Sequence, residues 1–277
     1  MGTNCMQAFA TRGPLMVRDV VLRVSFADIL IAGIGRIEQI ANVECYIAEP
    51  LGEGSQEKAI LFLTDAYGHK FVNNQVGESP GICAVIGILS HVLLQLLADD
   101  FARNGYHVIV PDLFQNDAVP SFVPPDASIS KEEFDVAAWV ERHPPEIVQG
   151  IVAQVVTALR ERGVKKFAAL GYCFGARIAI DLASAEATSV CVVSHPSFWK
   201  VPDDMERYLV ESKAPLLINS CEVDAMFPKE AQEKVDAILG GGRFKPGYER
   251  TYWQGCMHGF AVRGDMVRQP STAPFLG

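Results

Sequence analysis

The stretch Gly171–Gly175, which reads Gly-Tyr-Cys-Phe-Gly, constrains the fold more than any other part of this chain. It follows an apolar run of strand length, Lys166–Leu170, and precedes Ala176–Ala183, where the apolar residues recur at helical spacing. The flanking glycines permit a cramped backbone and close packing of the helix on the strand. Unpaired N–H groups at the start of the helix favour a thiolate at Cys173. The sequence therefore predicts a nucleophile turn of the G-x-S-x-G type, with a thiol in place of the hydroxyl.

Strand-length apolar runs alternate with helical patterns along most of the chain, which is typical of an α/β fold with a mostly parallel sheet. The predicted strands cover 43–48 as an edge strand, then 59–64, 106–110, 166–170, 189–193, 215–219 and 248–253. The predicted helices cover 98–105, 131–141, 145–162, 176–183 and 229–239. The 277 residues, 49% of them hydrophobic, suffice for one large core. We therefore expect a single domain over 1–277 with a doubly wound sheet flanked by helices.

Charge and cysteine content narrow the classes of partner. With a net charge of −9, a pI near 5.2 and no cluster of Lys or Arg, the chain is expected to bind a small organic molecule rather than nucleic acid or an anionic membrane. The seven cysteines are scattered and form no C-x-x-C pair, so neither a disulfide framework nor a metal site is predicted. The first residues show no signal-peptide pattern, so we expect a cytoplasmic protein in which Cys173 stays a thiol. The sequence does not distinguish a monomer from a dimer.

A thiol nucleophile needs a base, and the base needs an acid that orients it. In the α/β-hydrolase arrangement the nucleophile, acid and base occur in this chain order, the acid and base each on a loop after a strand. Asp224 follows the predicted strand 215–219, and His258 follows the predicted strand 248–253. Each residue also has an ordinary structural interpretation: Cys173 as a small buried residue, Asp224 as a helix entry and His258 as an exposed loop residue. It is much rarer for three such residues to occur by chance in the order of a triad than for the chain to contain one triad. We therefore predict an α/β-hydrolase fold in which Cys173 is the nucleophile, His258 the base within hydrogen-bonding reach, and Asp224 the acid.

An oxyanion hole is predicted beside this nucleophile. Its donors would be the N–H of Phe174, the residue after the nucleophile, and that of Ala66, in the loop after strand 59–64. Such donors stabilise the negative charge that develops on a carbonyl oxygen under attack. The pattern thus predicts acyl chemistry on an ester, a lactone or a thioester, with no cofactor.

Three motifs resemble those of the dienelactone hydrolase family, the carboxymethylenebutenolidases: Gly171–Gly175, Glu222–Asp224 and His258–Asp265. Three further stretches resemble its eukaryotic, especially fungal, branch: Asp65–Gly68, Pro111–Phe114 and His195–Phe198. The resemblance covers about residues 36–75 and 95–265. It implies a cysteine-based α/β-hydrolase that acts on a small lactone or ester.

A substrate pocket is expected beyond the carboxyl ends of the strands, where ligands gather in doubly wound sheets. In bacterial members of the family, a Glu at the position of Asp65 helps to form the thiolate, and an Arg four residues after the catalytic His holds the substrate carboxylate. Here Asp65 is one methylene shorter, and Val262 takes the place of that Arg. The exact substrate is therefore left open. The expected pocket residues are Asp65, Tyr67, Tyr172, His195, Phe260 and Arg263.

Three segments depart from the family pattern. Residues 76–94 separate two parts of the chain that the family joins almost directly, 17–35 interrupts a similar join, and 267–277 replaces a final helix. The stretch Val76–Gln95 fits an in-frame retained intron, because it begins Val-Gly and ends in Gln. We expect 17–35 and 76–94 to be peripheral to the core and the C-terminus to be truncated. Unspliced sequence and genuine lineage-specific insertions both stay open.

Two other interpretations stand beside the thiol hydrolase. An α/β-hydrolase-like binding protein, with a site impaired by these segments, would keep the fold without catalysis. A membrane-associated protein would use the apolar stretch 82–98. That stretch is slightly short for a span and continues into an amphipathic helix, so stable membrane insertion is not expected.

Overall fold

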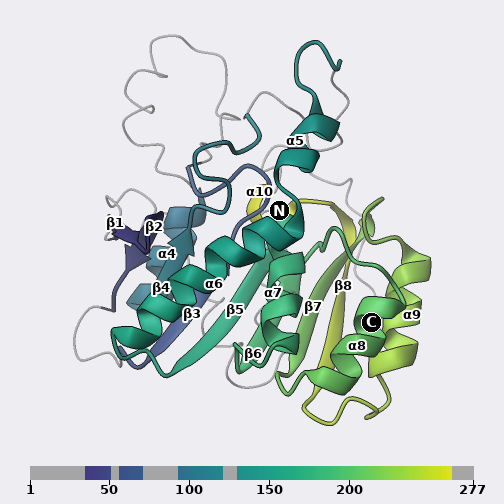
Figure 1. Cartoon of the computed structure of the whole chain (residues 1–277). Coiled ribbons are helices and arrows are strands. Elements are labelled where there is room, and N and C mark those ends of the chain that lie inside the picture. Colours follow the sequence, from purple (N-terminus) through teal and green to yellow (C-terminus); the bar gives the residue numbers. More distant parts are fainter. Residues whose placement is uncertain (1–34, 51–55, 71–92, 121–129, 264–277) are drawn as a thin grey trace.

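The computed structural model describes residues 35–50, 56–70, 93–120 and 130–263 (Figure 1). Within these ranges the chain forms one eight-stranded sheet in the order β1-β2-β4-β3-β5-β6-β7-β8. The strands are β1 (Arg36–Ile40), β2 (Val43–Ala48), β3 (Lys58–Leu63), β4 (His107–Pro111), β5 (Lys166–Tyr172), β6 (Val190–Ser194), β7 (Leu216–Val223) and β8 (Tyr248–Met257). Neighbours from β4 to β8 are parallel, whereas β1 and β2 run antiparallel to their neighbours. The predicted α/β class with a mostly parallel sheet is confirmed.

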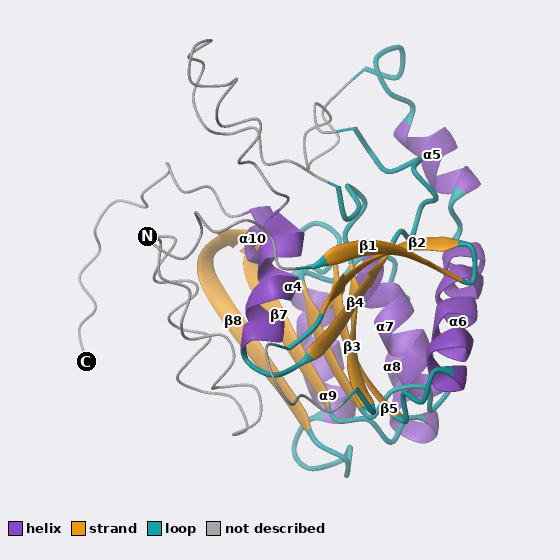
Figure 2. Ribbon diagram, turned by 90° about the vertical axis from the view of Figure 1, so that its left-hand side faces the viewer, coloured by secondary structure: helices purple, strands orange, loops and turns teal. Residues whose placement is uncertain are grey.

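Helices cover both faces of this sheet (Figure 2). The helices are α4 (Leu93–Arg103), α5 (Val136–Arg142), α6 (Pro145–Glu161), α7 (Phe174–Ser184), α8 (Asp203–Glu211), α9 (Lys229–Leu239) and α10 (Phe260–Arg263). Buried side chains of α6, α7, α8 and α9 belong to the larger hydrophobic cluster, and those of α4 and α10 belong to the smaller one. The two clusters lie on opposite faces of the sheet, so the sheet is doubly wound.

The central strand β3 shows why a continuous apolar run marks a strand buried on both faces. Successive side chains of a strand point to opposite faces. Leu61 and Leu63 therefore join the larger cluster, while Ile60 and Phe62 join the smaller one. All four are at most 5% exposed. This burial places the end of β3, and the loop that follows it, in the middle of the sheet.

The prediction that 43–48 is an edge strand is wrong, because β1 pairs outside it. The two strands form a hairpin in which Ile40 lies opposite Val43. The residues between them, Ala41 and Asn42, have φ of 50° and 63°, the left-handed conformation that a two-residue hairpin turn requires. Ala is an uncommon residue in such a turn, so the sequence carries a weak hairpin signal here.

Three helices differ from their prediction. The predicted helix 98–105 begins five residues earlier, since α4 spans Leu93–Arg103. The predicted helix 131–141 begins later, at Val136, because the Asp135 side chain accepts a hydrogen bond from the N–H of Ala138 (3.0 Å) and caps the helix there. The helix α8 was not predicted at all, although its first turn is acidic, as suits a helix N-terminus. It presents Met205 and Tyr208 to the core, both fully buried. The predicted helices 145–162 and 229–239 are confirmed within one residue.

The predictions for the three unusual segments fall on residues outside the described ranges. These are 17–35 except its last residue, 76–94 except its last two, and 267–277. In the part of the chain that the structure describes, no helix combines the length and apolar character needed to cross a membrane.

Candidate active site

Cys173 lies at the junction of β5 and α7, immediately before the helix. Its backbone has φ 50° and ψ −109°, a sparsely populated region that costs about 1–3 kcal/mol for a non-glycine residue. The flanking glycines make this junction possible. A Cβ at Gly171 would lie 2.6 Å from the carbonyl oxygen of Gly175, and a Cβ at Gly175 would lie 2.2 Å from that of Leu63. The predicted close packing of helix on strand is confirmed, and it requires glycine at both positions.

Asp224 and His258 come together at the carboxyl ends of β7 and β8. Parallel pairing of these strands aligns their ends, and an irregularity in the ladder at Cys221 and Val223 precedes the acid. The backbone N–H of His258 donates to the Val223 carbonyl (2.9 Å), which joins the two loops. The Nδ1 of His258 lies 2.9 Å from the Oδ1 of Asp224. The structure thus brings the predicted acid and base into hydrogen-bonding contact.

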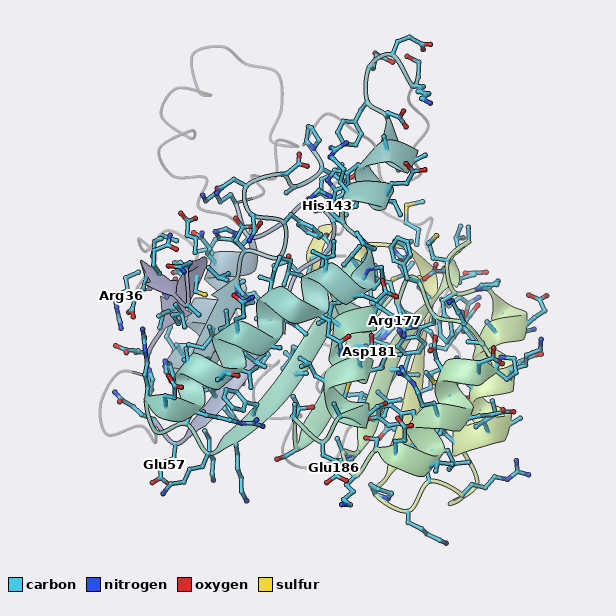
Figure 3. All side chains as sticks on the ribbon, viewed as in Figure 1. Arg36, Glu57, His143, Arg177, Asp181 and Glu186 are labelled. Atoms are coloured by element: carbon cyan, nitrogen blue, oxygen red, sulfur yellow. The ribbon has the colours of Figure 1, made fainter. Side chains whose placement is uncertain are left out.

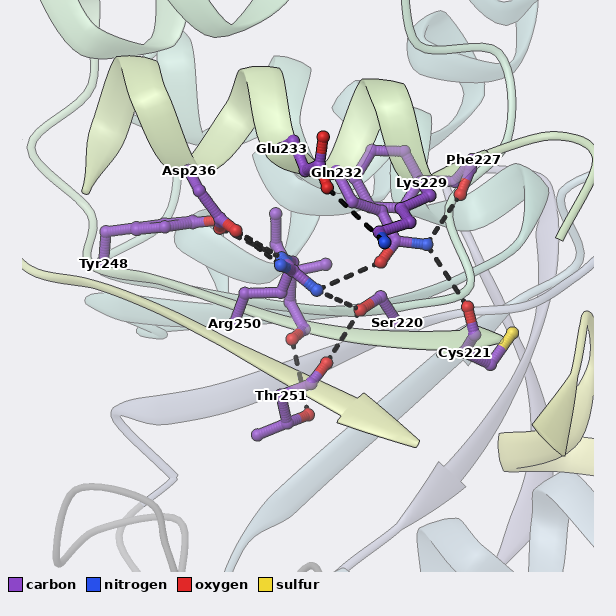
Figure 4. Close-up of polar contacts among 11 residues, drawn as sticks. Ser220, Cys221, Phe227, Lys229, Gln232, Glu233, Asp236, Tyr248, Arg250 and Thr251 are labelled. Atoms are coloured by element: carbon purple, nitrogen blue, oxygen red, sulfur yellow. Dashed lines mark hydrogen bonds and ion pairs between the residues drawn. The ribbon is translucent and has the colours of Figure 1, made fainter. Parts of the chain in front are cut away.

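The loop that carries Asp224 is held from both sides. The Asp224 carboxylate accepts hydrogen bonds from the N–H groups of Met226 (2.9 Å) and Phe227 (3.0 Å). Behind the loop, the amide of Gln232 donates to the carbonyls of Cys221 (3.2 Å) and Phe227 (2.9 Å) (Figure 4).

The amide of Gln232 is itself fixed by Arg250 on β8. The Arg250 guanidinium donates to the Oε1 of Gln232 (3.0 Å) and to the hydroxyl of Ser220 (2.9 Å), and it pairs with Asp236 (Figure 4). This polar cluster connects β7, β8 and α9 beneath the acid loop. It therefore orients the loop so that Asp224 meets the histidine.

Ser197 is a site residue that the sequence analysis did not include. Its hydroxyl lies 3.3 Å from the Sγ of Cys173 and 3.5 Å from the Nε2 of His258. The hydroxyl therefore forms a bridge between the thiol and the imidazole, in addition to the direct approach that the sequence predicts. Ser197 lies in His195–Phe198, a stretch that resembles the fungal branch of the family, and it follows a strand end, as Asp224 does; these are its signals in the sequence.

The ionisable groups of the site shift one another's pKa values. Burial by itself opposes the thiolate, but contact with His258 outweighs it, aided by the Ser197 hydroxyl and the N–H of Phe174, so the pKa of Cys173 lies below its ordinary value. Burial would likewise lower the pKa of His258, but Asp224 and the Cys173 thiol raise it to about 10. These contacts therefore favour the thiolate of Cys173 and the protonated form of His258.

The two predicted oxyanion donors lie in segments that touch. The N–H of Gly175, one residue into α7 from Phe174, donates to the carbonyl of Thr64 (3.0 Å). Ala66 follows Thr64 by two residues, and its own carbonyl accepts from the N–H of Val119 (2.9 Å). These contacts fix the loop after β3 against the nucleophile turn.

Two of the predicted pocket residues, Tyr172 and Phe260, gather with the base His258 around a third, His195. The ring of His195 lies 4.9 Å from that of His258, 5.5 Å from Phe260 and 6.1 Å from Tyr172, measured between centroids. Tyr172 also stacks on Phe62 at 4.9 Å. His195 is fully buried, and neither of its ring nitrogens has a hydrogen-bond partner among the described residues. Burial, reinforced by the charge of His258, holds the pKa of His195 well below its ordinary value, so this ring is neutral.

The other predicted pocket residues are less involved with the triad. Asp65 is buried, and its carboxylate accepts a hydrogen bond from the N–H of Tyr67 (3.0 Å). Tyr67 packs into the larger hydrophobic cluster. Arg263 is the last residue of α10, and its neighbour Val262 packs into the smaller cluster. Within the described ranges, no three His, Cys, Asp or Glu side chains are grouped so as to hold a metal ion.

The two ring nitrogens of His195, which have no hydrogen-bond partner among the described residues, lead to a prediction on stability. A buried polar group without a partner costs about 1–3 kcal/mol. We expect His195→Phe to remove this cost and raise the Tm by about 2–4 °C for each kcal/mol recovered, while lowering turnover if the ring contacts substrate. Differential scanning calorimetry measures the first effect and kcat the second.

The same substitution at His143 is the matched control. That ring also lies among aromatic side chains, but its Nδ1 is 2.9 Å from the Trp139 carbonyl. His143→Phe is therefore expected to lower the Tm. Equal effects at both positions would contradict the interpretation of His195 as unsatisfied.

The chain matches the model of the dienelactone hydrolase family over residues 81–273. It is 33% identical over 241 residues to Hydrolase tropI of Talaromyces stipitatus, covering 84% of this chain and 81% of that protein. It is 28% identical over 233 residues to Dienlactone hydrolase 1 of Gibberella moniliformis, covering 83% and 78% respectively.

A solved structure shows the same fold. A candidate dienelactone hydrolase from Klebsiella pneumoniae superposes with a TM-score of 0.59 over 85% of this chain and 91% of that one, at 16% identity. At this identity the likeness concerns the fold alone. The match to the family model and the identity to the fungal relatives go further: this chain is a member of the dienelactone hydrolase family.

Proposed function

We propose that this protein is a thiol hydrolase that opens a lactone, ester or thioester by way of an acyl-enzyme on Cys173. The observation that carries the proposal is the thiol at the nucleophile turn, whose pKa is lowered chiefly by His258, itself hydrogen-bonded to Asp224. The thiolate, and not the thiol, is the nucleophilic form of cysteine, so a lowered pKa favours attack. Family membership supports hydrolysis. The assignment of Cys173, His258 and Asp224 as its catalytic triad is our inference.

The reaction follows from the roles of these groups. The Cys173 thiolate attacks the carbonyl carbon, and the oxygen that becomes negative is held by the N–H groups of Phe174 and Ala66. As the carbon–oxygen bond breaks, His258 gives its Nε2 proton to the leaving oxygen, which leaves a thioester on Cys173. Neutral His258 then takes a proton from water, the resulting hydroxide attacks the thioester, and the thiolate departs. Asp224 keeps the imidazole oriented throughout.

The site supports a substrate with an apolar or aromatic part. The ring of His195 contacts those of His258, Tyr172 and Phe260, and His195 is neutral. The fungal relatives are named as hydrolases, and we extend the proposal to a role in fungal specialised metabolism or the breakdown of aromatic compounds. A neutral lactone or aryl ester is therefore the first substrate class to screen.

Selective alkylation tests the nucleophile. We expect iodoacetamide to modify Cys173 much faster than Cys191 or Cys45 at neutral pH, because burial raises the pKa of each of those thiols to about 12. The lowered pKa of Cys173 also fixes the pH dependence. As the pH falls below about 8.5, an ordinary thiol loses its thiolate, whereas Cys173 keeps it until the pH passes through its own lower pKa. The ratio of the Cys173 rate to that of glutathione should thus rise as the pH falls.

Mass spectrometry after brief exposure to a p-nitrophenyl ester completes the test. An acyl group on the tryptic peptide that contains Cys173 is the expected result. Acylation of some other residue, or alkylation of all described cysteines at one rate, would contradict the proposal.

A further inference from the structure

The bridge formed by Ser197 has the geometry of a proton carrier. Its hydroxyl oxygen lies 3.3 Å from the Cys173 sulfur and 3.5 Å from the His258 Nε2. A hydroxyl has one proton to donate and two lone pairs with which to accept, so it can accept from one neighbour while it donates to the other. Catalytic hydrogen bonds are often long before substrate binds, and tighten in the complex.

The backbone around Ser197 is built to hold the hydroxyl there. Ser197 is 1% exposed, and its N–H donates to the carbonyl of Cys173 (3.1 Å). On either side of it, His195 and Phe198 have φ of 40° and 62°. Non-glycine residues with positive φ cost about 1–3 kcal/mol each, and they persist where the surrounding structure enforces them.

A partly buried arginine holds this loop from the helix that follows the nucleophile. The guanidinium of Arg177 donates to the Phe198 carbonyl (3.3 Å) and to Asp204 (2.6 Å). It also donates to Asp181 (2.8 Å), beside it on the same helix (Figure 3). Arg177 lies one turn into α7, the helix that Cys173 precedes. The loop and the nucleophile are thus positioned by the same element.

We propose that Ser197 is a catalytic residue, whose hydroxyl carries the proton from the Cys173 thiol to His258 and then stays hydrogen-bonded to the thiolate. The inference rests on the proposed function. In the step, the S–H bond breaks as its proton moves to Oγ, and the original O–H bond breaks as that proton moves to Nε2. Serine is unchanged, and the net result is a thiolate and an imidazolium. The Oγ–H then donates to sulfur while Nε2–H donates to Oγ.

The test is the pH profile of Cys173 alkylation by iodoacetamide in hydroxyl-free variants. A hydrogen bond to a charged group contributes about 1.5–3 kcal/mol, and 1.36 kcal/mol corresponds to one pKa unit. In Ser197→Ala we therefore expect the apparent pKa of the thiol to rise, and alkylation at neutral pH to slow by about ten- to a hundredfold. Ser197→Thr, which keeps a hydroxyl, should stay within about threefold of the wild type.

A matched pair keeps the test decisive if Ser197→Ala does not fold. Ser197→Val has the shape of Ser197→Thr without the hydroxyl, so the proposal predicts a slow Val variant and a fast Thr variant. Ser194→Ala is the control, because the Ser194 hydroxyl is buried three residues away and bonds to Asn219 (3.1 Å). Its pH profile should not move.

Equal rates in the Thr and Val variants, or an unshifted profile in Ser197→Ala, would overturn the role of Ser197. Because alkylation needs no substrate, this result is independent of turnover. A wild-type protein that alkylates rapidly at Cys173 but hydrolyses no ester would instead contradict the proposed function alone.

Discussion

The Cys173→Ala variant is expected to lose at least about a thousandfold in the kcat of ester hydrolysis while keeping its fold. Removal of a covalent nucleophile leaves only the oxyanion donors and substrate binding, which give a small residual rate. The side chain is partly exposed and belongs to neither hydrophobic cluster, so stability should change little. Stopped-flow release of p-nitrophenol measures both the burst of acylation and the steady rate, and both should disappear.

Cys191→Ala is the matched control for loss of a thiol. Cys191 is fully buried on β6, within the larger hydrophobic cluster and away from the triad. Its truncation should lower the Tm through a small cavity and leave kcat within about twofold, because no reacting group is touched. If Cys173→Ala hydrolysed esters at the wild-type rate, the thiol mechanism would be wrong. A wild-type protein without any turnover on a broad lactone and ester panel would instead favour a binding protein that keeps the hydrolase fold.

Gly175→Ala is expected to destabilise the whole domain by roughly 3 kcal/mol or more, which lowers the Tm by about 6–12 °C. The added Cβ would lie 2.2 Å from the Leu63 carbonyl oxygen and 2.6 Å from that of Thr64. Both are backbone atoms of a central strand end, so relief requires α7 to move away from β3. That movement would break the hydrogen bond from the Gly175 N–H to Thr64 (3.0 Å). Because Ala66 follows Thr64, turnover should fall as well.

Gly150→Ala is the control for this effect. Gly150 lies on the exposed side of α6, and an added Cβ there meets nothing within 4 Å. In a helix interior, alanine is more favourable than glycine by about 1 kcal/mol, so the Tm should rise by roughly 2–4 °C. Thermal unfolding of the two variants side by side separates the steric effect from the general cost of replacing glycine. A Gly175→Ala protein as stable as the wild type would contradict the close packing of α7 on β3.

The elements that the sequence predicted well are those whose signal is local. β5 and α7 are identified by an apolar run, a glycine-bounded turn and a helical pattern that follow one another directly. α6 is marked by Pro145 at its first turn and by Gly163, with φ 99°, just after its end. Continuous apolar runs of strand length likewise indicate a parallel sheet that is covered on both faces.

The elements that the sequence missed depend on contacts between distant segments. β1 is amphipathic, half exposed and short, and it becomes a strand because it pairs with β2 across an uncommon Ala41-Asn42 turn. That pairing also moves β2 from the edge to an inner position. α8 spans only nine residues, and its place depends on Tyr208, whose hydroxyl donates to the Ala214 carbonyl (2.8 Å).

For the site, the sequence determined the residue types and the strand ends at which they lie. Parallel strands carry their carboxyl ends to one edge of the sheet, so a nucleophile turn after β5 and polar loops after β7 and β8 had to converge, whatever the details of packing. The order of the nucleophile, acid and base along the chain is likewise a property of the sequence. The roles of these residues as a triad stay a proposal for the alkylation and turnover experiments.

Only the tertiary structure decided which further groups enter the site. Ser197 meets Cys173 across 24 residues and His258 across 61, through a loop with positive φ that Arg177 holds in place. His195 is enclosed by three aromatic rings, and neither of its ring nitrogens has a hydrogen-bond partner among the described residues. Neither outcome has a local signature, because a serine or histidine after a strand looks the same in sequence whether it faces solvent or the reacting atoms. Burial and distance set their chemistry, and both arise only when the sheet and helices pack.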